Sequence, residues 1–295
     1  MSRLSQMVRA LLRQRALLVF VAILALYGIY VYWRSLQNYV STDDAYVGAH
    51  VISIAAQVSG PVARVYVHNN TPVAAHARLF EIDTHPYEIA VQAAQATVQE
   101  RRAILTNAQA IWGRTQRMAA HRFLSPQASD TARATVNADA AALAAAQAAL
   151  ARARLNLAHC LVRAPARGYL SDMRLQPGAY IQAGTPLFAL IAAHPYWVTA
   201  NFKETAIADI ALGDRAHIHV DMYPGYVFHG KVVGISGGSG TAFSLLPPEN
   251  ATGNWVKVTQ RVPVRILILN LDPRRPLRIG TSADAVVFFR RAHRH

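Results

Sequence analysis

The chain has 295 residues, a formal net charge of +14, 53% hydrophobic residues and a single cysteine, Cys160. This length suits two or three modest domains, and one cysteine excludes an internal disulfide. Only three residues are lysine, so arginines scattered along the chain supply most of the positive charge. Nucleic-acid binders usually gather such charge on one face beside a recognition motif, and we find no such motif, so we expect no nucleic-acid partner.

An apolar segment near the N-terminus, residues 16–33, carries no charged side chain. As a helix rising ~1.5 Å per residue it would be roughly 27 Å long, close to the thickness of a bilayer core. Arginines precede it and aromatic residues crowd its far end, so the positive-inside rule places residues 1–15 in the cytoplasm and the remainder outside. A cleaved signal peptide is the alternative, but no small-x-small cleavage site follows. We therefore expect a single-pass anchor followed by a linker, 34–45.

Two later segments, residues 60–82 and 168–190, match each other with a constant offset of 108 residues. Both alternate apolar and polar residues and break at Asn, Gly or Pro, which is typical of short strands joined by turns. The two halves therefore predict a small β-sandwich with pseudo-two-fold symmetry. The matched pairs include Gly60 with Gly168, Phe80 with Phe188, and Ile82 with Leu190.

The residues between these halves are rich in Ala, Gln and Arg, which favours helix over 86–122 and again over 126–157. Ser125 and Pro126 form a typical helix start. Small and apolar residues recur every seven positions in both arms, which predicts an antiparallel two-helix coiled coil. A helical domain packed on the rest is the alternative, but no third amphipathic helix lies nearby. The seven-residue series are Val91, Val98, Leu105 and Trp112, then Val136, Leu143, Leu150 and Leu157, with Asp139, Ala146, Ala153 and Cys160 three positions further on.

The C-terminal part of the chain alternates like a set of strands, which predicts a small β-barrel. A short helix ending before Gly213 is expected between the first two strands. The expected strands fall within 196–204, 215–223, 226–235, 255–269 and 284–289.

Glycines and an Asn-x-Thr sequon make residues 237–255 a candidate site. A phosphate-binding Walker loop needs a lysine after its last glycine, and Thr241 follows Gly240 instead. The sequon at Asn250 would need a glycosylating compartment. The segment is therefore interpreted as a long ordered loop of the barrel.

His217, His219 and Asp221 would share one face of a strand, because side chains alternate with a period of two. Too few good ligands lie close together to complete a metal shell, so they are interpreted as exposed strand residues. No nucleophile–base or carboxylate-pair motif stands out, and we expect no enzyme, no cofactor and no metal. We interpret Cys160 as a small core residue.

The order of anchor, split β-sandwich, helical hairpin and barrel resembles the membrane fusion proteins, the HlyD family of periplasmic adaptors. The resemblance covers nearly the whole chain and is closest to the EmrA-type multidrug efflux branch, which pairs with major-facilitator antiporters. Its most specific strings are "STDDAYV", "WVTANFKET" and "GTAFSLLPPENATGNWVKVTQRVPVRI".

This resemblance implies a lipoyl-like fold for the sandwich, which in true lipoyl domains carries a cofactor on a lysine. No lysine precedes Lys203, so this sandwich cannot be a carrier arm. His76 stands where the family usually has the glycine that Gly184 supplies in the second half, and Pro72 also departs from the family pattern. Both departures should alter the local turn geometry and leave the fold unaffected.

The resemblance also implies a contact site at the hairpin tip. Arg114-x3-Met118-x6-Ser125 is similar to the Arg-x3-Leu-x6-Ser motif by which such adaptors meet a TolC-type outer-membrane channel. Met in place of Leu keeps an apolar side chain of similar volume. From the residues alone, a solvated arginine, a seam methionine and a capping serine remain the alternative.

The expected fold class is a multi-domain chain of mixed α and β structure: an N-terminal transmembrane helix, a split lipoyl-like β-sandwich, an antiparallel coiled-coil hairpin and a C-terminal β-barrel. We expect an inner-membrane adaptor, bulk in the periplasm, that links a major-facilitator type transporter to a TolC-type outer-membrane channel for the efflux of drugs and toxic compounds. It is expected to assemble into a homo-oligomeric ring. An adaptor of an ABC-type protein secretion system and a non-transport envelope scaffold are alternatives. The expected ranges are 1–15, 16–33, 34–45, 46–84 (first half), 85–157 (hairpin), 158–193 (second half) and 194–295 (barrel and tail).

Overall fold

The structure is a computed structural model that describes residues 27–28, 39–121, 123–243 and 258–289. Among these residues, no helix has both the length and the apolar character needed to span a bilayer. The expected anchor, 16–33, lies outside the described part of the chain except for Tyr27 and Gly28.

The chain divides into two compact units. One comprises residues 50–194, and the other comprises the residues before 50 together with those after 194. Two long strands, β1 (Tyr39–Ala55) and β8 (Pro186–Lys203), contribute residues to both units.

The 50–194 unit contains the β-sandwich. Its four-stranded sheet has the order β5-β4-β2-β7, and β3 and β6 continue the other sheet from β8. Large apolar side chains from both sheets form its core, with Leu79, Phe80, Ile82 and Leu190 fully buried. The strands are β2 (Gly60–Val65), β3 (Pro72–Val73), β4 (Arg78–Ile82), β5 (Leu161–Arg163), β6 (Gly168–Ser171) and β7 (Tyr180–Ile181).

The strand pairing confirms the sequence repeat. Gly60 of β2 pairs with Ile181 of β7, and Gly168 of β6 pairs with Val73 of β3, so the two pairs are related by the 108-residue offset. Phe80 and Phe188, another matched pair, meet at the centre with ring centroids 6.0 Å apart.

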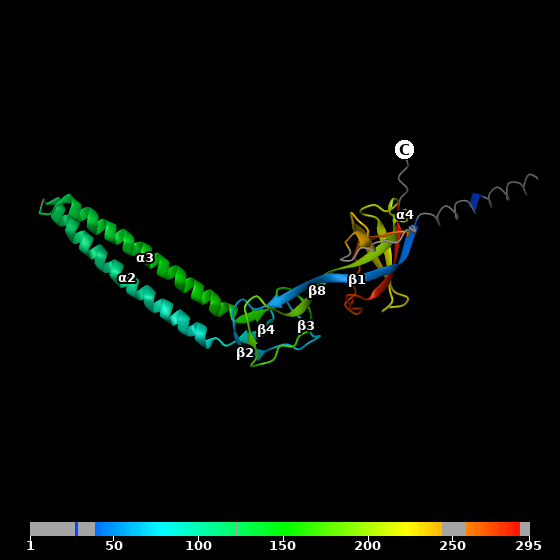
Figure 1. Cartoon of the computed structure of the whole chain (residues 1–295), viewed down its shortest axis with the longest axis horizontal. Coiled ribbons are helices and arrows are strands. Elements are labelled where there is room, and N and C mark those ends of the chain that lie inside the picture. Colours follow the sequence, from blue (N-terminus) through cyan, green and yellow to red (C-terminus); the bar gives the residue numbers. More distant parts are fainter. Residues whose placement is uncertain (1–26, 29–38, 122, 244–257, 290–295) are drawn as a thin grey trace, which may run out of the picture. The chain divides into compact units, whose positions relative to one another are not determined.

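Two long helices, α2 (His85–Ala120) and α3 (Pro126–His159), separate the halves of the sandwich and lie side by side as a hairpin (Figure 1). Val98 of α2 and Ala146 and Leu150 of α3 are buried between them, with Leu143 packed against this group. These are residues of the seven-residue series, so the series lies at the helix–helix contact; the supercoiling of a coiled coil stays a prediction.

The other unit contains a barrel. Its strand order is β1-β12-β9-β10-β11-β8, and β1 also pairs with β8, so the six strands form a closed circuit. Phe202, Ile218, Phe228 and Ile266 are fully buried inside it. The remaining elements are α4 (Glu204–Ile207), β9 (Arg215–Val220), β10 (Val227–Ile235), the 3-10 helix η1 (Gly240–Phe243), β11 (Arg261–Ile268) and β12 (Ser282–Phe288).

The expected linker 34–45 needs a correction over residues 39–45. These residues are the first part of β1, and they pair with β12 from Tyr39 opposite Phe288 to Ala45 opposite Ala283. The two consecutive aspartates, Asp43 and Asp44, look like a loop in the sequence. The pairing register shifts between Thr42 and Ala45, so a bulge accommodates both aspartates within the strand.

The expected loop 237–255 is described only as far as Phe243, where η1 ends, and the rest of it lies outside the described residues.

Candidate functional site

The hairpin tip is held by local hydrogen bonds. The Phe123 amide donates to the Met118 carbonyl at 3.0 Å as α2 ends. The Ser125 hydroxyl then accepts from the Ala128 amide at 3.4 Å, and Pro126 takes the first helical position of α3. The expected helix start at Ser125 and Pro126 is therefore confirmed.

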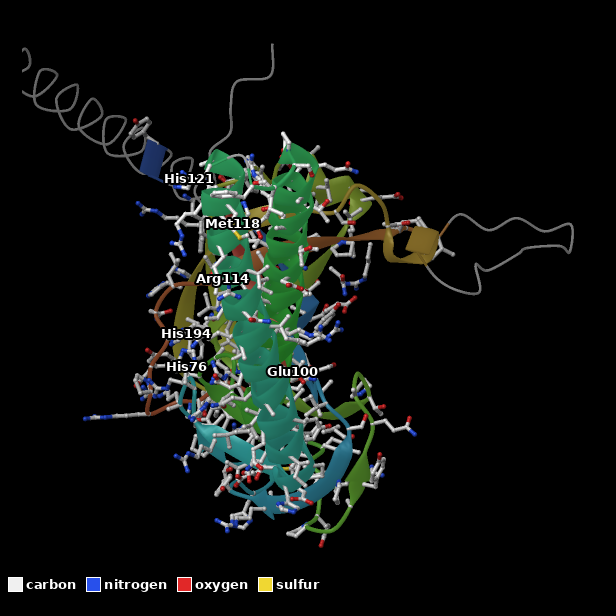
Figure 2. The ribbon with its side chains drawn as sticks, turned by 90° about the vertical axis from the view of Figure 1, so that its left-hand side faces the viewer. His76, Glu100, Arg114, Met118, His121 and His194 are labelled. Atoms are coloured by element: carbon white, nitrogen blue, oxygen red, sulfur yellow. The ribbon has the colours of Figure 1, made fainter. Side chains whose placement is uncertain are left out.

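Two of the three expected contact residues lie on one face of α2, since Arg114 and Met118 are four positions apart. Figure 2 shows them along α2 with His121, and both side chains are exposed, Met118 at 47%. Ser125 is exposed too, in the turn. No hydrogen bond among the described residues joins any two of the three. The structure therefore gathers them at one end of the hairpin without placing them in mutual contact.

Two apolar residues that no sequence motif singled out lie at the same tip. Phe123 is 76% exposed and Leu124 is 36% exposed. Leu124 directly precedes the capping Ser125, where an apolar residue often packs against the fourth helical position, but that position is Ser129. Phe123 and Leu124 are adjacent apolar residues in a short polar turn, and the fourth helical position offers them no apolar partner. This pattern is a signal that could have identified both residues from the sequence. We define the tip surface as Arg114, Met118, Phe123, Leu124 and Ser125.

A second arrangement joins the three strings that carried the family resemblance. Thr42, 8% exposed, donates from its hydroxyl to the Asn201 carbonyl at 2.8 Å. The Arg261 Nη1 group donates to the same carbonyl at 3.1 Å and to the Thr42 hydroxyl at 3.2 Å. Asn201 Nδ2 donates to Asp44 Oδ1 at 3.0 Å, and Asp44 Oδ2 lies 3.4 Å from Arg261 Nη1. This network connects β1, β8 and β11, so these residues hold three neighbouring strands of the barrel together.

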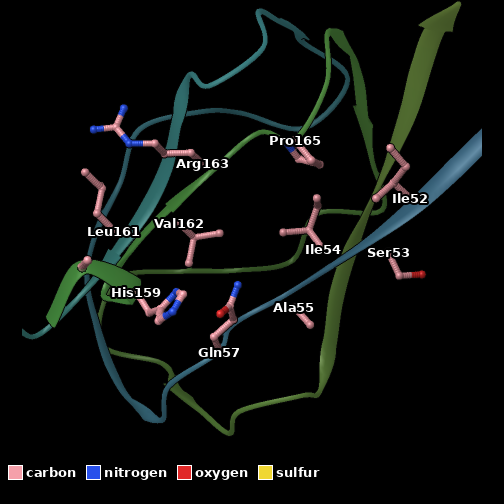
Figure 3. A pocket seen from close by; sticks show the side chains of 11 residues that line it. Ile52, Ser53, Ile54, Ala55, Gln57, His159, Leu161, Val162, Arg163 and Pro165 are labelled. Atoms are coloured by element: carbon pink, nitrogen blue, oxygen red, sulfur yellow. The ribbon is translucent and has the colours of Figure 1, made fainter. Parts of the chain in front are cut away.

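A groove in the 50–194 unit lies between β1 and the segment that leads from α3 into β5 (Figure 3). Its volume is about 390 Å³. Ile52, Ile54 and Val162 contribute apolar side chains to its lining, and His159 and Arg163 contribute polar ones. The Arg163 guanidinium also donates to the His76 carbonyl at 3.1 Å, which ties β5 to the neighbouring turn.

Of the three residues expected to be exposed on one strand, His219 is exposed on the outside of the barrel, His217 is half-buried there, and Asp221 is exposed just beyond the end of β9. His217 of β9 pairs with His229 of β10, and their ring centroids are 5.0 Å apart. Partial burial lowers the pKa of His217 from its ordinary value, and the neighbouring charges of His229 and His219 lower it further. The described residues contain no group of three or more potential ligands that could hold a metal ion.

Cys160 is fully buried at the end of α3, in the sandwich core. Burial, followed by the charge of Asp83, raises its pKa to about 11. The thiol is therefore protonated at neutral pH and is a poor nucleophile.

Comparison with known proteins gives two family matches. Residues 50–193 match the "RND MFP, barrel-sandwich hybrid domain", and residues 195–288 match the "AAEA-like beta-barrel domain". The chain is also 33% identical to the multidrug export protein EmrA of Haemophilus influenzae, across 93% of this chain and 84% of that protein. The chain belongs to the membrane fusion protein family.

Other relatives agree with this assignment. The chain is 36% identical to the fatty acid resistance protein FarA of Neisseria gonorrhoeae, across 83% of this chain and 75% of the relative. It is 30% identical to the multidrug resistance protein MdtN of Escherichia coli, across 91% of this chain and 94% of the relative.

Solved structures of the membrane fusion family share the fold. The protein Spr0693 from Streptococcus pneumoniae aligns with a TM-score of 0.62 at 16% identity, covering 85% of this chain and 99% of that one. A MacA–MexA chimera with the Pseudomonas aeruginosa MexA α-hairpin domain aligns with a TM-score of 0.59 at 20% identity, covering 86% and 82%. The expected lipoyl-like sandwich and C-terminal barrel are therefore present as the barrel-sandwich and β-barrel domains of this family.

Proposed function

We propose that this membrane fusion protein is the periplasmic adaptor of an efflux pump, linking an inner-membrane transporter of the major-facilitator type to a TolC-type outer-membrane channel. The observation that carries the proposal is the contrast within the hairpin. Leu150 and Val98 are buried between the helices, whereas Met118, Phe123 and Leu124 expose apolar surface at the far end. Exposed apolar residues gathered at one end suit a docking surface.

The proposed topology follows from the sequence. Residues 1–15 lie in the cytoplasm, 16–33 cross the inner membrane once, and the two folded units lie in the periplasm. The chain assembles with copies of itself into a ring, so that the hairpin tips together meet the channel. We assign no reaction, cofactor or metal to the chain, and the energy for transport comes from the partner transporter.

The cargo class is suggested by the relatives. Their names refer to multidrug export and to fatty acid resistance, and a fatty acid is an amphiphile. We therefore propose that the pump exports toxic amphiphilic compounds. The main alternative, an adaptor for protein secretion, is disfavoured because those adaptors usually have much longer hairpins than helices of 36 and 34 residues.

The tip surface gives the decisive test. A photoreactive residue is placed at position 118 in cells that contain the channel, and drug resistance is measured in parallel. The parent should crosslink to the channel and confer resistance. Arg114→Asp reverses the charge presented to the channel, so crosslinking and resistance should both fall, because like charges at a docking patch oppose association.

Arg102→Asp is the matched control, since Arg102 is also exposed on α2 but lies about 18 Å further from the tip at ~1.5 Å per residue. It should keep both properties. Melting temperatures of both variants should stay near the parent, because exposed charge changes usually alter stability by less than ~0.5 kcal/mol. Crosslinks from position 118 to the adaptor alone would contradict the channel contact.

A further inference from the structure

Two like charges face each other on the outside of the barrel. Arg215 of β9 is directly opposite Lys231 of β10, and both side chains are exposed. Like charges opposite each other in a sheet are destabilising. Neither side chain takes part in any ion pair within the described part of the chain. The neighbouring Asp214 carboxylate is engaged elsewhere, accepting from the Ala211 amide at 2.8 Å. A partner of negative charge would remove this repulsion.

The same outer face continues with histidines. Two residues away from the Arg215–Lys231 pair on each strand, His217 lies opposite His229, and His219 follows on β9. We define the basic face as Arg215, His217, His219, His229 and Lys231. Asp284 of β12 is opposite His219, at the end of the face farthest from Arg215. The charge is therefore concentrated where Arg215 and Lys231 meet.

Aromatic side chains border this concentrated charge. Phe288 of β12 is opposite Arg215, and Tyr39 of β1 is opposite Phe288. The two rings lie 6.3 Å apart, and their side chains are 40% and 42% exposed. Exposed aromatic rings beside cationic side chains are the combination that proteins present to the headgroup region of a membrane.

The proposed anchor would bring this end of the barrel close to the membrane. Tyr39 is six residues after Trp33, the last residue of the expected span. A fully extended chain advances at most about 3.6 Å per residue, so an anchor that ends at Trp33 would keep Tyr39 within roughly 20 Å of the membrane surface. The aromatic border and the Arg215–Lys231 pair lie at the same end of their strands as Tyr39.

We propose that the basic face docks the barrel on the anionic phospholipid headgroups of the membrane that holds the chain. The phosphodiester groups of phosphatidylglycerol would lie against Arg215 and Lys231, and Phe288 and Tyr39 would enter the headgroup region. The inference rests on the proposed membrane anchor and goes beyond it, because it adds a contact made by the folded barrel. Each cation near an anionic surface should strengthen docking roughly fivefold.

The test uses the full chain in vesicles of phosphatidylcholine, with or without phosphatidylglycerol. A fluorophore is attached at Ser41→Cys, with Cys160 replaced by Ala, and the vesicles contain lipids with a quencher on the headgroup. Ser41 is exposed on β1, opposite Val286 and beside the basic face. A fluorophore at Ser282→Cys, at the other end of β12, is the positional control.

The label at position 41 should be quenched more strongly with phosphatidylglycerol, and added salt should reduce the difference. The double variant Arg215→Gln, Lys231→Gln should lower quenching to the level seen in phosphatidylcholine. Arg274→Gln is the matched control, because it removes a charge from an exposed turn between β11 and β12, and it should change nothing. The label at position 282 should be indifferent to lipid charge.

Equal quenching in the two lipids, or unchanged quenching in the double variant, overturns the proposal. Quenching that follows the number of protein copies per vesicle instead of lipid charge would assign the face to a second copy, and this also overturns it. Flotation with the vesicles reports the anchor separately. A chain that does not float overturns both the anchor and the docking, whereas a chain that floats with a silent label overturns the docking alone.

Discussion

His76 and Gly184 occupy equivalent turns in the two halves of the sandwich, and both have a positive φ, 62° and 82°. Their amides donate equivalent hydrogen bonds, from His76 to the Ala164 carbonyl at 2.8 Å and from Gly184 to the Ala56 carbonyl at 2.9 Å. The two acceptors are also 108 residues apart, so the pseudo-symmetry extends to single hydrogen bonds. The first half therefore holds a histidine in a conformation that its Cβ disfavours.

Exchanging these two residue types should move stability in opposite directions. The left-handed conformation costs a non-glycine residue about 1–2 kcal/mol in the folded state. A glycine makes the unfolded chain more flexible, which stabilises the unfolded state and offsets roughly 0.5–1 kcal/mol of that difference. His76→Gly should therefore stabilise the protein by about 0.5–1 kcal/mol, and Gly184→His should destabilise it by a similar amount. No heavy atom lies within 4 Å of a Cβ placed at Gly184, so the effect there is a backbone effect.

Thermal unfolding of the full chain would measure both variants. Asn70, which also has a positive φ of 58°, provides a control, because asparagine tolerates this conformation better than histidine. Asn70→Gly should therefore gain less than His76→Gly. A lower melting temperature for His76→Gly would contradict this account of the turn.

The parts of the fold that could be predicted are those encoded at short or constant spacing. The 108-residue repeat and the seven-residue series needed only counting, and both correspond to observed pairing and burial. The network of Thr42, Asn201 and Arg261 could not be predicted in this way, because its members come from three strands far apart in the sequence. Strand pairing over such separations depends on the whole barrel, and no local spacing records it.

The tip surface shows a similar limit. The sequence pattern selected Arg114, Met118 and Ser125, but nothing in the spacing distinguishes an exposed methionine from a seam methionine. The structure shows that Met118 is exposed and not buried in the seam, and it adds the exposed Phe123 and Leu124 to the tip surface. The bulge at Asp43 and Asp44 could not be predicted either, because two adjacent charged residues usually indicate a loop. Here a shift in the strand register accommodates both aspartates within β1.

The helix–helix contact should be sensitive to charge. Leu150 is only 8% exposed and Leu143 packs against it, so Leu143→Asp with Leu150→Asp would bury two carboxylates between α2 and α3. Burying polar groups without partners costs several kcal/mol. We expect the helices to separate, amide hydrogen exchange in both to rise, and drug efflux to fail.

Leu155→Asp is the matched control for the seam, because Leu155 is on the same helix but 56% exposed. It should leave exchange rates and efflux close to the parent. If the double variant retained full drug resistance at normal expression, the contact between the helices would be unnecessary for function.

Ser125 has two roles that substitution can separate, capping α3 and contacting the channel. Ser125→Ala removes the cap and should destabilise the hairpin by about 1 kcal/mol. Ser125→Asn keeps a capping side chain, so its melting temperature should match the parent. Its larger amide should nevertheless weaken docking, which would appear as lower crosslinking from position 118. Full crosslinking and efflux in Ser125→Asn would limit Ser125 to the capping role.

His217 should titrate below an ordinary histidine. Partial burial is the main cause of its lowered pKa, followed by the charges of His229 and His219. The other charged groups on the paired strands are Arg215 and Lys231, which are cationic, and Asp284, which is anionic and lies opposite His219. Histidine NMR titration of the full chain in nanodiscs would measure the pKa, and His229→Asn should raise it by removing one neighbouring charge.

The consequence for stability follows from proton binding. The ordinary histidine pKa is near 6.5, and between that value and the lowered folded pKa the unfolded chain binds more protons than the folded one. The contribution of His217 to stability is therefore intact above pH 6.5, declines as the pH falls towards the folded pKa, and is constant below it. Urea unfolding across this range should show a smaller decline for His229→Asn than for the parent. A parent whose stability rises on acidification through this window, with His217 titrating at or above 6.5, would contradict the assignment.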